Sequence, residues 1–187
     1  LPMRRLEAEA IRDTILTVSG RLDRTLYGPA IEPFRTAEDA QKRLFKGPLD
    51  GNGRRSVYIE MTLMEPSRFL ALFNQPIPKQ TVGRRDVSNV PDQALALLND
   101  PFVTAMSKHW SERLVSDGAT SPEQRIHSML EAALVRSPGQ DEVASLLQLT
   151  RRSAELRSET GELLKCQVAW QDAAHVIFNM KEFLYVR

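Results

Sequence analysis

The sequence has little cysteine, no long apolar run and almost no net charge. Its one cysteine, Cys166, excludes an internal disulfide and a cluster of thiolate metal ligands. No run of roughly 18 apolar residues occurs, so the sequence offers no membrane span. Lys and Arg number 25 against 24 Asp and Glu, a formal net charge of +1. That balance provides no global attraction to nucleic acid or to an anionic membrane, so we predict no nucleic-acid partner.

The residues that are present follow a helical pattern over most of the chain. Hydrophobic residues make up 42% and charged residues 26% of the 187 residues, which is typical of a globular domain. Apolar residues at Ala8, Ile11, Ile15 and Val18 follow steps of three and four and predict a first helix. We therefore predict a mainly α fold: a single helical domain over residues 1–187, forming a helical bundle with a small irregular or two-stranded insert at about 47–90.

Local signals mark the helix ends after Pro91. Pro91 occupies a first helical position, Asp100 and Pro101 form an N-cap followed by N1, and residues 121–124 form a capping box. Trp110 and Trp170 lie in apolar stripes and are predicted core anchors. We predict that the region from Pro91 to Met180 is almost entirely helical, in four main helices. The predicted breaks lie near Asn99, residues 117–118, residues 138–139 and Gly161.

The insert carries the clearest strand pattern. Val57, Ile59, Met61 and Leu63 alternate with their neighbours at period two, which predicts a strand that pairs with residues 81–87. Short helices are predicted at 37–45 and after Pro66.

Several phrases of the sequence together resemble one known family. They are RRLEAEAIRD at 4–13, SGRLD at 19–23, RRSVY at 54–58, the long stretch GRRDVSNVPDQALALLNDPFV at 83–103, WQD at 170–172, FN at 178–179 and EFLYV at 182–186. In this order they resemble domain of unknown function 1553, a planctomycete-specific domain at the C-terminus of cytochrome-c-associated proteins.

This resemblance implies a context and no particular activity. It implies that the chain is the C-terminal fragment of a longer multidomain protein, exported to the periplasm or beyond, whose upstream domains carry a haem-attachment motif. The chain contains no Cys-x-x-Cys-His sequence, so we expect no cofactor in this fragment and haem only upstream. The expected partners are the upstream domains of the same polypeptide. The family supplies no established catalytic residues.

Two arginine pairs form the most suggestive charged cluster. Arg54 and Arg55 precede the predicted strand, and Arg84 and Arg85 follow it, next to Asp86. A guanidinium binds carboxylate, phosphate or sulfate with two parallel hydrogen bonds, so these five residues are the candidate ligand- or partner-binding site. The alternative is that the arginines bind carboxylates of the bundle. We favour this alternative and expect Arg84 or Arg85 to make a bidentate internal contact.

The other polar clusters are more simply structural. Arg5, Glu9, Arg12 and Asp13 lie three and four residues apart on one helix, and a neighbouring arginine lowers a carboxyl pKa, the wrong direction for a general acid. Asp172 and His175 share a helix face, which is compatible with an oriented imidazole but does not make a triad. No His-Glu-x-x-His spacing occurs, so no metal site is predicted.

An internal echo links two helix ends. Residues 92–99 and 172–179 share one spacing, and each is followed by a phenylalanine, Phe102 or Phe183. We predict that Asn99 and Asn179 end their helices, because asparagine tolerates the left-handed backbone conformation found there. We also predict that both phenylalanines are buried, and that an alanine and the final apolar pair of each helix pack inward.

Two functions follow from these observations. The first is a non-catalytic structural or interaction module of a larger exported protein. The alternative is part of an enzyme or binding protein that acts on an anionic glycan, a sulfated or uronic polysaccharide, with the arginine pairs as substrate contacts. Convergence of both pairs on one pocket would favour the second function. The sequence shows no catalytic motif.

Overall fold

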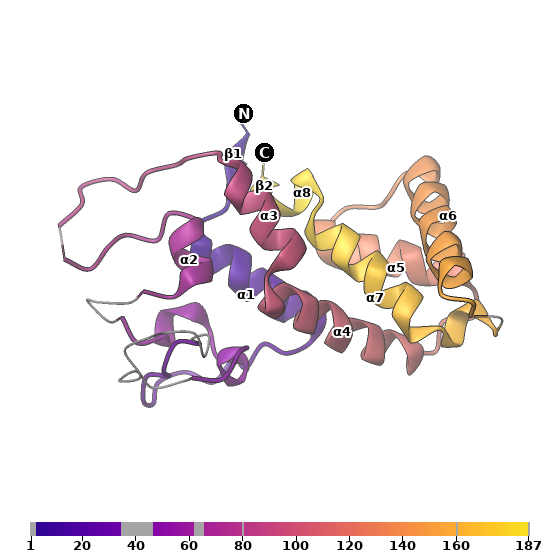
Figure 1. Cartoon of the computed structure of the whole chain (residues 1–187), viewed down its shortest axis with the longest axis horizontal. Coiled ribbons are helices and arrows are strands. Elements are labelled where there is room, and N and C mark those ends of the chain that lie inside the picture. The colour runs from indigo at the N-terminus through magenta and orange to yellow at the C-terminus, as the bar shows by residue number, and fades with distance from the viewer. Residues whose placement is uncertain (1–2, 35–46, 62–65, 80, 160, 187) are drawn as a thin grey trace.

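The fold is mainly helical, as predicted, with one short two-stranded sheet among the described residues (Figure 1). The computed structural model describes residues 3–34, 47–61, 66–79, 81–159 and 161–186. Its elements are β1 (Arg4–Arg5), α1 (Ala8–Ser19), the 3₁₀ helices η1 (Gly51–Gly53) and η2 (Ser56–Tyr58), α2 (Arg68–Leu72), α3 (Pro91–Asn99), α4 (Pro101–Val115), α5 (Pro122–Leu134), α6 (Gln140–Leu156), the 3₁₀ helix η3 (Leu163–Lys165), α7 (Gln167–Phe178), α8 (Lys181–Leu184) and β2 (Tyr185–Val186).

The core forms where α4 lies along α7. The ring centroids of Trp110 and Phe178 are 5.4 Å apart, and Trp170 is fully buried. Helix α1 packs on α4, and α6 packs on α5 and α7. Both tryptophans are therefore core anchors, as predicted, and each removes a large apolar surface from water.

The described ends of the chain meet in a short antiparallel sheet. Arg4 pairs with Val186 and Arg5 with Tyr185, and the Leu6 amide donates to the Leu184 carbonyl at 2.8 Å. Figure 1 shows the two ends side by side next to α3. The two-stranded element thus joins the described ends of the chain, and the described part of the insert holds no strand of a sheet.

The strand predicted in the insert is wrong over its described part. Ser56–Tyr58 forms η2, Val57 is 72% exposed, and Ile59 forms a single parallel bridge with Ile31. The cause is Asp13 of α1, whose carboxylate accepts hydrogen bonds from the Ser56 amide at 2.8 Å and the Ser56 hydroxyl at 2.7 Å. This anchor turns the backbone before the alternating pattern can form a ladder. Residues 81–87, the predicted partner of this strand, form no strand. Residues 62–65 of the predicted strand and the predicted helix at 37–45 lie outside the described residues.

The region after Pro91 is helical as predicted, but it holds five main helices where four were expected. Asp100 caps α4 by accepting from the Phe102 amide at 2.8 Å, and Ser121 caps α5 by accepting from the Gln124 amide at 3.1 Å. The return bond of the predicted capping box goes to Thr120, whose amide donates to Gln124 Oε1 at 2.9 Å. The last long helix, α7, begins at Gln167, because η3 occupies the residues before it.

The echo is confirmed at the helix ends. Asn99 Nδ2 donates to the Leu95 carbonyl at 3.0 Å and Asn179 Nδ2 to the His175 carbonyl at 2.8 Å, while Phe102 and Phe183 are buried. The predicted left-handed geometry is wrong, because Asn179 has a φ of −91°.

The predicted inward packing is correct only for the second copy of the echo. In α7 both Ala174 and the final apolar pair are buried, whereas in α3 Ala94 is exposed and Leu98 is 52% exposed. The difference arises because α7 lies inside the bundle and α3 lies on its surface.

Candidate functional site

No pocket lined by the described residues brings the two predicted arginine pairs together. Arg54 Nη2 donates to the Tyr27 carbonyl at 2.7 Å, and its guanidinium lies 4.0 Å from the centroid of the Tyr58 ring. Arg55 Nε lies 3.6 Å from the Asp13 carboxylate. These contacts hold the segment around residue 27 and the insert against α1, so this pair has an internal role.

Arg85 makes the bidentate internal contact expected of the second pair. Its Nη1 and Nη2 donate to the Glu9 carboxylate at 2.7 and 3.1 Å, and Glu7 lies 3.4 Å from Nη1. Burial raises the pKa of Glu9, but the hydrogen bonds and charge of Arg85 outweigh burial and leave that pKa below its usual value. The hydrogen bonds to Glu9 likewise raise the pKa of Arg85. Arg84 and Asp86 lie beside this pair and line a pocket with Arg4 and Arg5, but Arg54 and Arg55 do not line it.

Two buried arginines of the first strand and helix hold distant loops in place. Arg12 is 3% exposed and donates to the Arg54 carbonyl at 3.0 Å, the Ser56 hydroxyl at 3.1 Å and the Asp50 carbonyl at 2.7 Å. Burial lowers the pKa of Arg12 to about 10, so the guanidinium stays charged at neutral pH. Arg5 is 7% exposed and is bound by oxygens of other segments. Arg5 and Arg12 thus bind groups of their own chain, as the structural interpretation expects.

A third buried arginine, Arg125 of α5, was not singled out from the sequence. Its Nη2 donates to Asp117 at 2.8 Å, its Nη1 to the Leu164 carbonyl at 2.6 Å, and its guanidinium lies 4.8 Å from the centroid of the Trp170 ring. Arg125 stands at an ordinary helical position, so no local pattern in the sequence predicts its burial.

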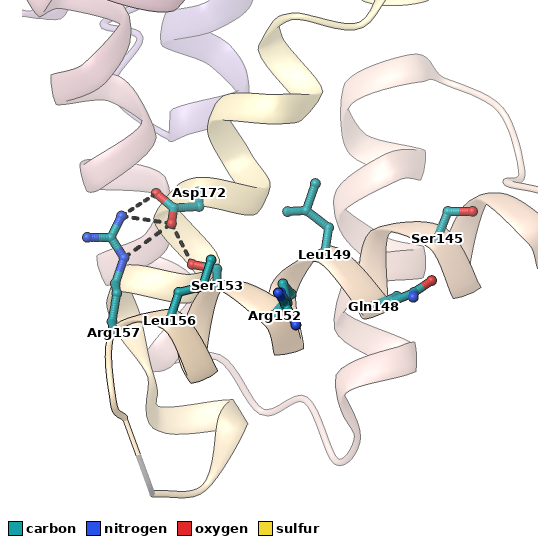
Figure 2. Close-up of a pocket in the computed structure, with 8 residues that line it drawn as sticks. All are labelled: Ser145, Gln148, Leu149, Arg152, Ser153, Leu156, Arg157 and Asp172. Carbon is teal, nitrogen blue, oxygen red and sulfur yellow. Dashed lines mark hydrogen bonds and ion pairs between the residues drawn. The ribbon is translucent and has the colours of Figure 1, made fainter.

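A hollow of about 710 Å³ opens between α6 and α7 (Figure 2). Figure 2 shows Asp172 of α7 facing Ser153 of α6 and Arg157, the residue after α6, at one end. Arg157 Nη2 donates to both Asp172 oxygens, at 2.8 and 3.1 Å, and the Ser153 hydroxyl also donates to this carboxylate. Leu149, Arg152 and Leu156 follow one another along the α6 side of this hollow.

A second hollow, of about 430 Å³, lies between α7 and α3. Asp172 lines both hollows, so this residue borders each of them. We call the two hollows together the α7 trough. It is lined by Ser145, Gln148, Leu149, Arg152, Ser153, Leu156 and Arg157 of α6 and the residue after it, by Asp172, His175, Val176, Asn179 and Met180 of α7 and the residues after it, and by Leu98 of α3.

Leucines on both walls of the α7 trough face solvent. Leu156 is 73% exposed and Leu149 is 37% exposed on the α6 side, and Leu98 is 52% exposed on the α3 side. Leu95, one turn before Leu98, is 54% exposed. Apolar side chains that gather on one surface mark an interaction site more often than scattered ones do. The sequence patterns above do not predict this surface, although Leu149 and Leu156 lie seven residues apart on a helix otherwise rich in charge.

Asp172 and His175 of the α7 trough bind different groups of the chain. His175 Nε2 lies 2.9 Å from the Leu97 carbonyl, while Asp172 binds Arg157 and Ser153. The imidazole and the carboxylate therefore have separate structural partners. Among the described residues no group of three or more His, Cys, Asp and Glu side chains is placed to hold a metal ion.

The fold and the site define a class of protein: a mainly helical domain in which several charged side chains join distant segments and exposed leucines line a surface hollow. The chain belongs to the PSD1 family, described as protein of unknown function (DUF1553), whose model matches residues 1–150. The family expected from the sequence is thus confirmed. No curated protein and no solved structure matches the chain. None of the described helices has the length and apolarity to cross a membrane.

Proposed function

We propose that this chain is a non-catalytic interaction module of a larger exported protein, and that the α7 trough is its docking surface. The observation that carries the proposal is the pair of exposed leucine rims, formed by Leu149 and Leu156 on one side and Leu98 on the other. Complete burial of one such leucine contributes roughly 1.5–3 kcal/mol, so a partner that covers several gains a useful affinity.

The proposed partner is the upstream part of the same polypeptide. The resemblance of the sequence to this family is the basis on which we propose a parent protein of several domains, with haem in an upstream domain and none in this fragment, and with the whole exported to the periplasm or beyond. An intramolecular partner needs only a modest surface, because the linker supplies a high effective concentration.

The alternative function, action on an anionic polysaccharide through both arginine pairs, has less support. Arg54 and Arg55 contact the carbonyl of Tyr27 and the carboxylate of Asp13, outside the pocket lined by Arg84 and Arg85. Guanidinium groups that bind their own chain present fewer free donors to a ligand.

A binding experiment with matched leucine variants tests the docking proposal. The purified chain is titrated with the purified upstream region of its parent protein in a calorimeter. We expect Leu98→Asp and Leu156→Asp each to weaken binding by about tenfold or more, because each places a charge in an apolar contact. The control is Leu26→Asp, since Leu26 is 58% exposed and does not line the trough.

Circular dichroism confirms that each variant keeps the helical fold. Equal affinity of all three variants, or no binding by the wild-type chain, would contradict the proposal.

A further inference from the structure

The pocket that Arg84 and Asp86 line with Arg4 and Arg5 lies where β1 meets α1, next to residues 84–87. Its volume is about 480 Å³, within the range of small-molecule sites. The charged residues that line it are Arg4, Arg5, Glu7, Arg84, Arg85 and Asp86. Four arginines and two carboxylates thus line the pocket, which gives it an excess of positive charge in a chain whose formal net charge is only +1.

We propose that this pocket binds a small organic anion through a carboxylate or sulfate group. The proposal does not depend on the docking function of the α7 trough, because the two surfaces share no lining residue.

The charges of the lining are not equally free. Arg85 is bound by Glu9 and lies 3.4 Å from Glu7, so these three groups largely neutralise one another. Asp86 then stands against Arg4, Arg5 and Arg84. The pocket keeps an excess of positive charge even after its internal pairs are counted.

Arg5 carries a buried charge with no carboxylate partner. Its Nη1 donates to Gln93 Oε1 at 2.8 Å and to the Ser88 carbonyl, and its Nη2 donates to Asn74 Oδ1 at 2.7 Å and to the Phe73 carbonyl at 3.2 Å. All four acceptors are neutral, and within the described residues Arg5 forms no ion pair. A cation held in a poorly solvated place raises the local affinity for an anion. The Nε atom of Arg5 also has no hydrogen-bond partner among the described residues.

Arg4 and Arg84 supply the exposed donors of the pocket. Both side chains belong to exposed residues, and neither forms an ion pair with any described residue. Each guanidinium presents the planar pair of donors that matches a carboxylate or sulfate. The proposed site therefore has one buried cation, Arg5, and two exposed cations, Arg4 and Arg84. Arg85 lines the pocket but is already paired with Glu9.

Titration with defined anions tests the site. The full chain is titrated with sodium sulfate, with glucuronate and with a sulfated disaccharide, at about 20 mM and about 150 mM salt, and binding is followed by the amide shifts of residues 4–8 and 84–88 in NMR spectra. We expect saturable binding that weakens at the higher salt concentration. A sulfated disaccharide that binds more tightly than sulfate identifies a glycan as the source of the anion, and equal affinities identify a free oxyanion.

Three variants of exposed residues decide whether the pocket is responsible. Arg84→Ala should weaken binding about tenfold, since a charge-assisted hydrogen bond is lost, and Asp86→Asn should strengthen it severalfold, since a competing carboxylate is removed. Arg152→Ala is the control, because Arg152 is an exposed arginine of α6 outside this pocket. Absence of saturable binding, or an equal loss of affinity in Arg84→Ala and Arg152→Ala, would overturn the proposal.

Discussion

Arg85 binds Glu9 with both of its terminal nitrogens, at 2.7 and 3.1 Å. Glu9 lies in the first turn of α1, and Arg85 lies 76 residues later in the segment before α3. The pair therefore ties a long connection to the first helix. Its side chains are 38% and 26% exposed, so water screens the attraction.

Removal of this pair is predicted to have a modest, pH-dependent effect on stability. Arg85→Ala and Glu9→Gln should each lower the free energy of unfolding by about 1 kcal/mol near neutral pH. Because Arg85 lowers the pKa of Glu9 in the folded state, the stabilisation is present above the ordinary value of 4.5 and is lost as pH falls through the lower folded value. Urea unfolding at neutral and acidic pH measures this.

The difference in the free energy of unfolding between wild type and Arg85→Ala should shrink in acid. Arg84→Ala is the control, and its free energy of unfolding should match that of wild type at both pH values, since Arg84 forms no ion pair with a described residue. A difference that is constant with pH would show that the Glu9 charge is not the partner that matters.

Arg12→Ala is predicted to be much more damaging. The variant leaves the Asp50 and Arg54 carbonyls and the Ser56 hydroxyl without their buried donor, and it removes a side chain that lies 5.5 Å from the centroid of the Phe102 ring. The expected loss is about 3–5 kcal/mol in the free energy of unfolding.

Arg21→Ala is the matched control for this experiment. Arg21 also binds Asp50, but its side chain is 43% exposed, so the expected loss stays below about 1 kcal/mol. Similar urea midpoints for the two variants would show that burial does not set the strength of the Arg12 contacts.

Local signals made most of the helices predictable. Pro91, Asp100 with Pro101, and Ser121 with Pro122 each mark a helix start through their own backbone and side-chain chemistry, and the structure begins α3, α4 and α5 there. Such signals need no knowledge of the rest of the fold.

The contacts between distant segments were less predictable. The 3₁₀ turn at Ser56 depends on Asp13, which is 43 residues away, and the Arg12 contacts end largely on main-chain carbonyls that every residue possesses. No sequence pattern specifies such partners. The α7 trough was missed for a related reason: Leu97 and Leu98 are adjacent in the sequence, and only the position of α3 on the bundle buries one and exposes the other.

Asp100 offers a test of charge at a helix cap. Burial raises the pKa of Asp100, although the hydrogen bond from the Phe102 amide and the charge of Arg68 oppose this effect. A raised folded-state pKa means that stability falls as pH rises from the ordinary value of 3.8 through the folded value. At neutral pH, Asp100→Asn should therefore match or slightly exceed the wild type, because it keeps the cap and removes the charge.

Asp100→Ala should cost about 1 kcal/mol, since it removes the cap. Thermal unfolding compares the two variants. A larger loss for Asn than for Ala would contradict the assignment of the carboxylate as a cap whose charge is unfavourable.

The two asparagines of the echo are predicted to differ in importance. Asn179 donates to the His175 carbonyl at 2.8 Å in a half-buried position next to α3, whereas the Asn99 bond to Leu95 faces solvent. Asn179→Ala should lower the free energy of unfolding by about 1 kcal/mol and Asn99→Ala by less than about 0.5 kcal/mol. Equal losses in chemical denaturation would mean that exposure does not distinguish the two bonds.

Gly53 is predicted to tolerate substitution poorly, because two backbones meet there. Its φ is +76°, and a Cβ atom at this position would lie 2.1 Å from the Arg21 carbonyl oxygen. The Gly53 carbonyl accepts a hydrogen bond from the Asp23 amide at 2.8 Å, so the two segments cannot separate without loss of this bond. Gly53→Ala should therefore cost about 3 kcal/mol or more, from left-handed strain and the clash together.

Gly83→Ala is the control, because no atom lies within 4 Å of the added Cβ, and its effect should stay within about 1 kcal/mol. Urea midpoints of the two variants provide the measurement, and a Gly53→Ala midpoint equal to that of Gly83→Ala would show that the segments around residues 21 and 53 do not approach this closely.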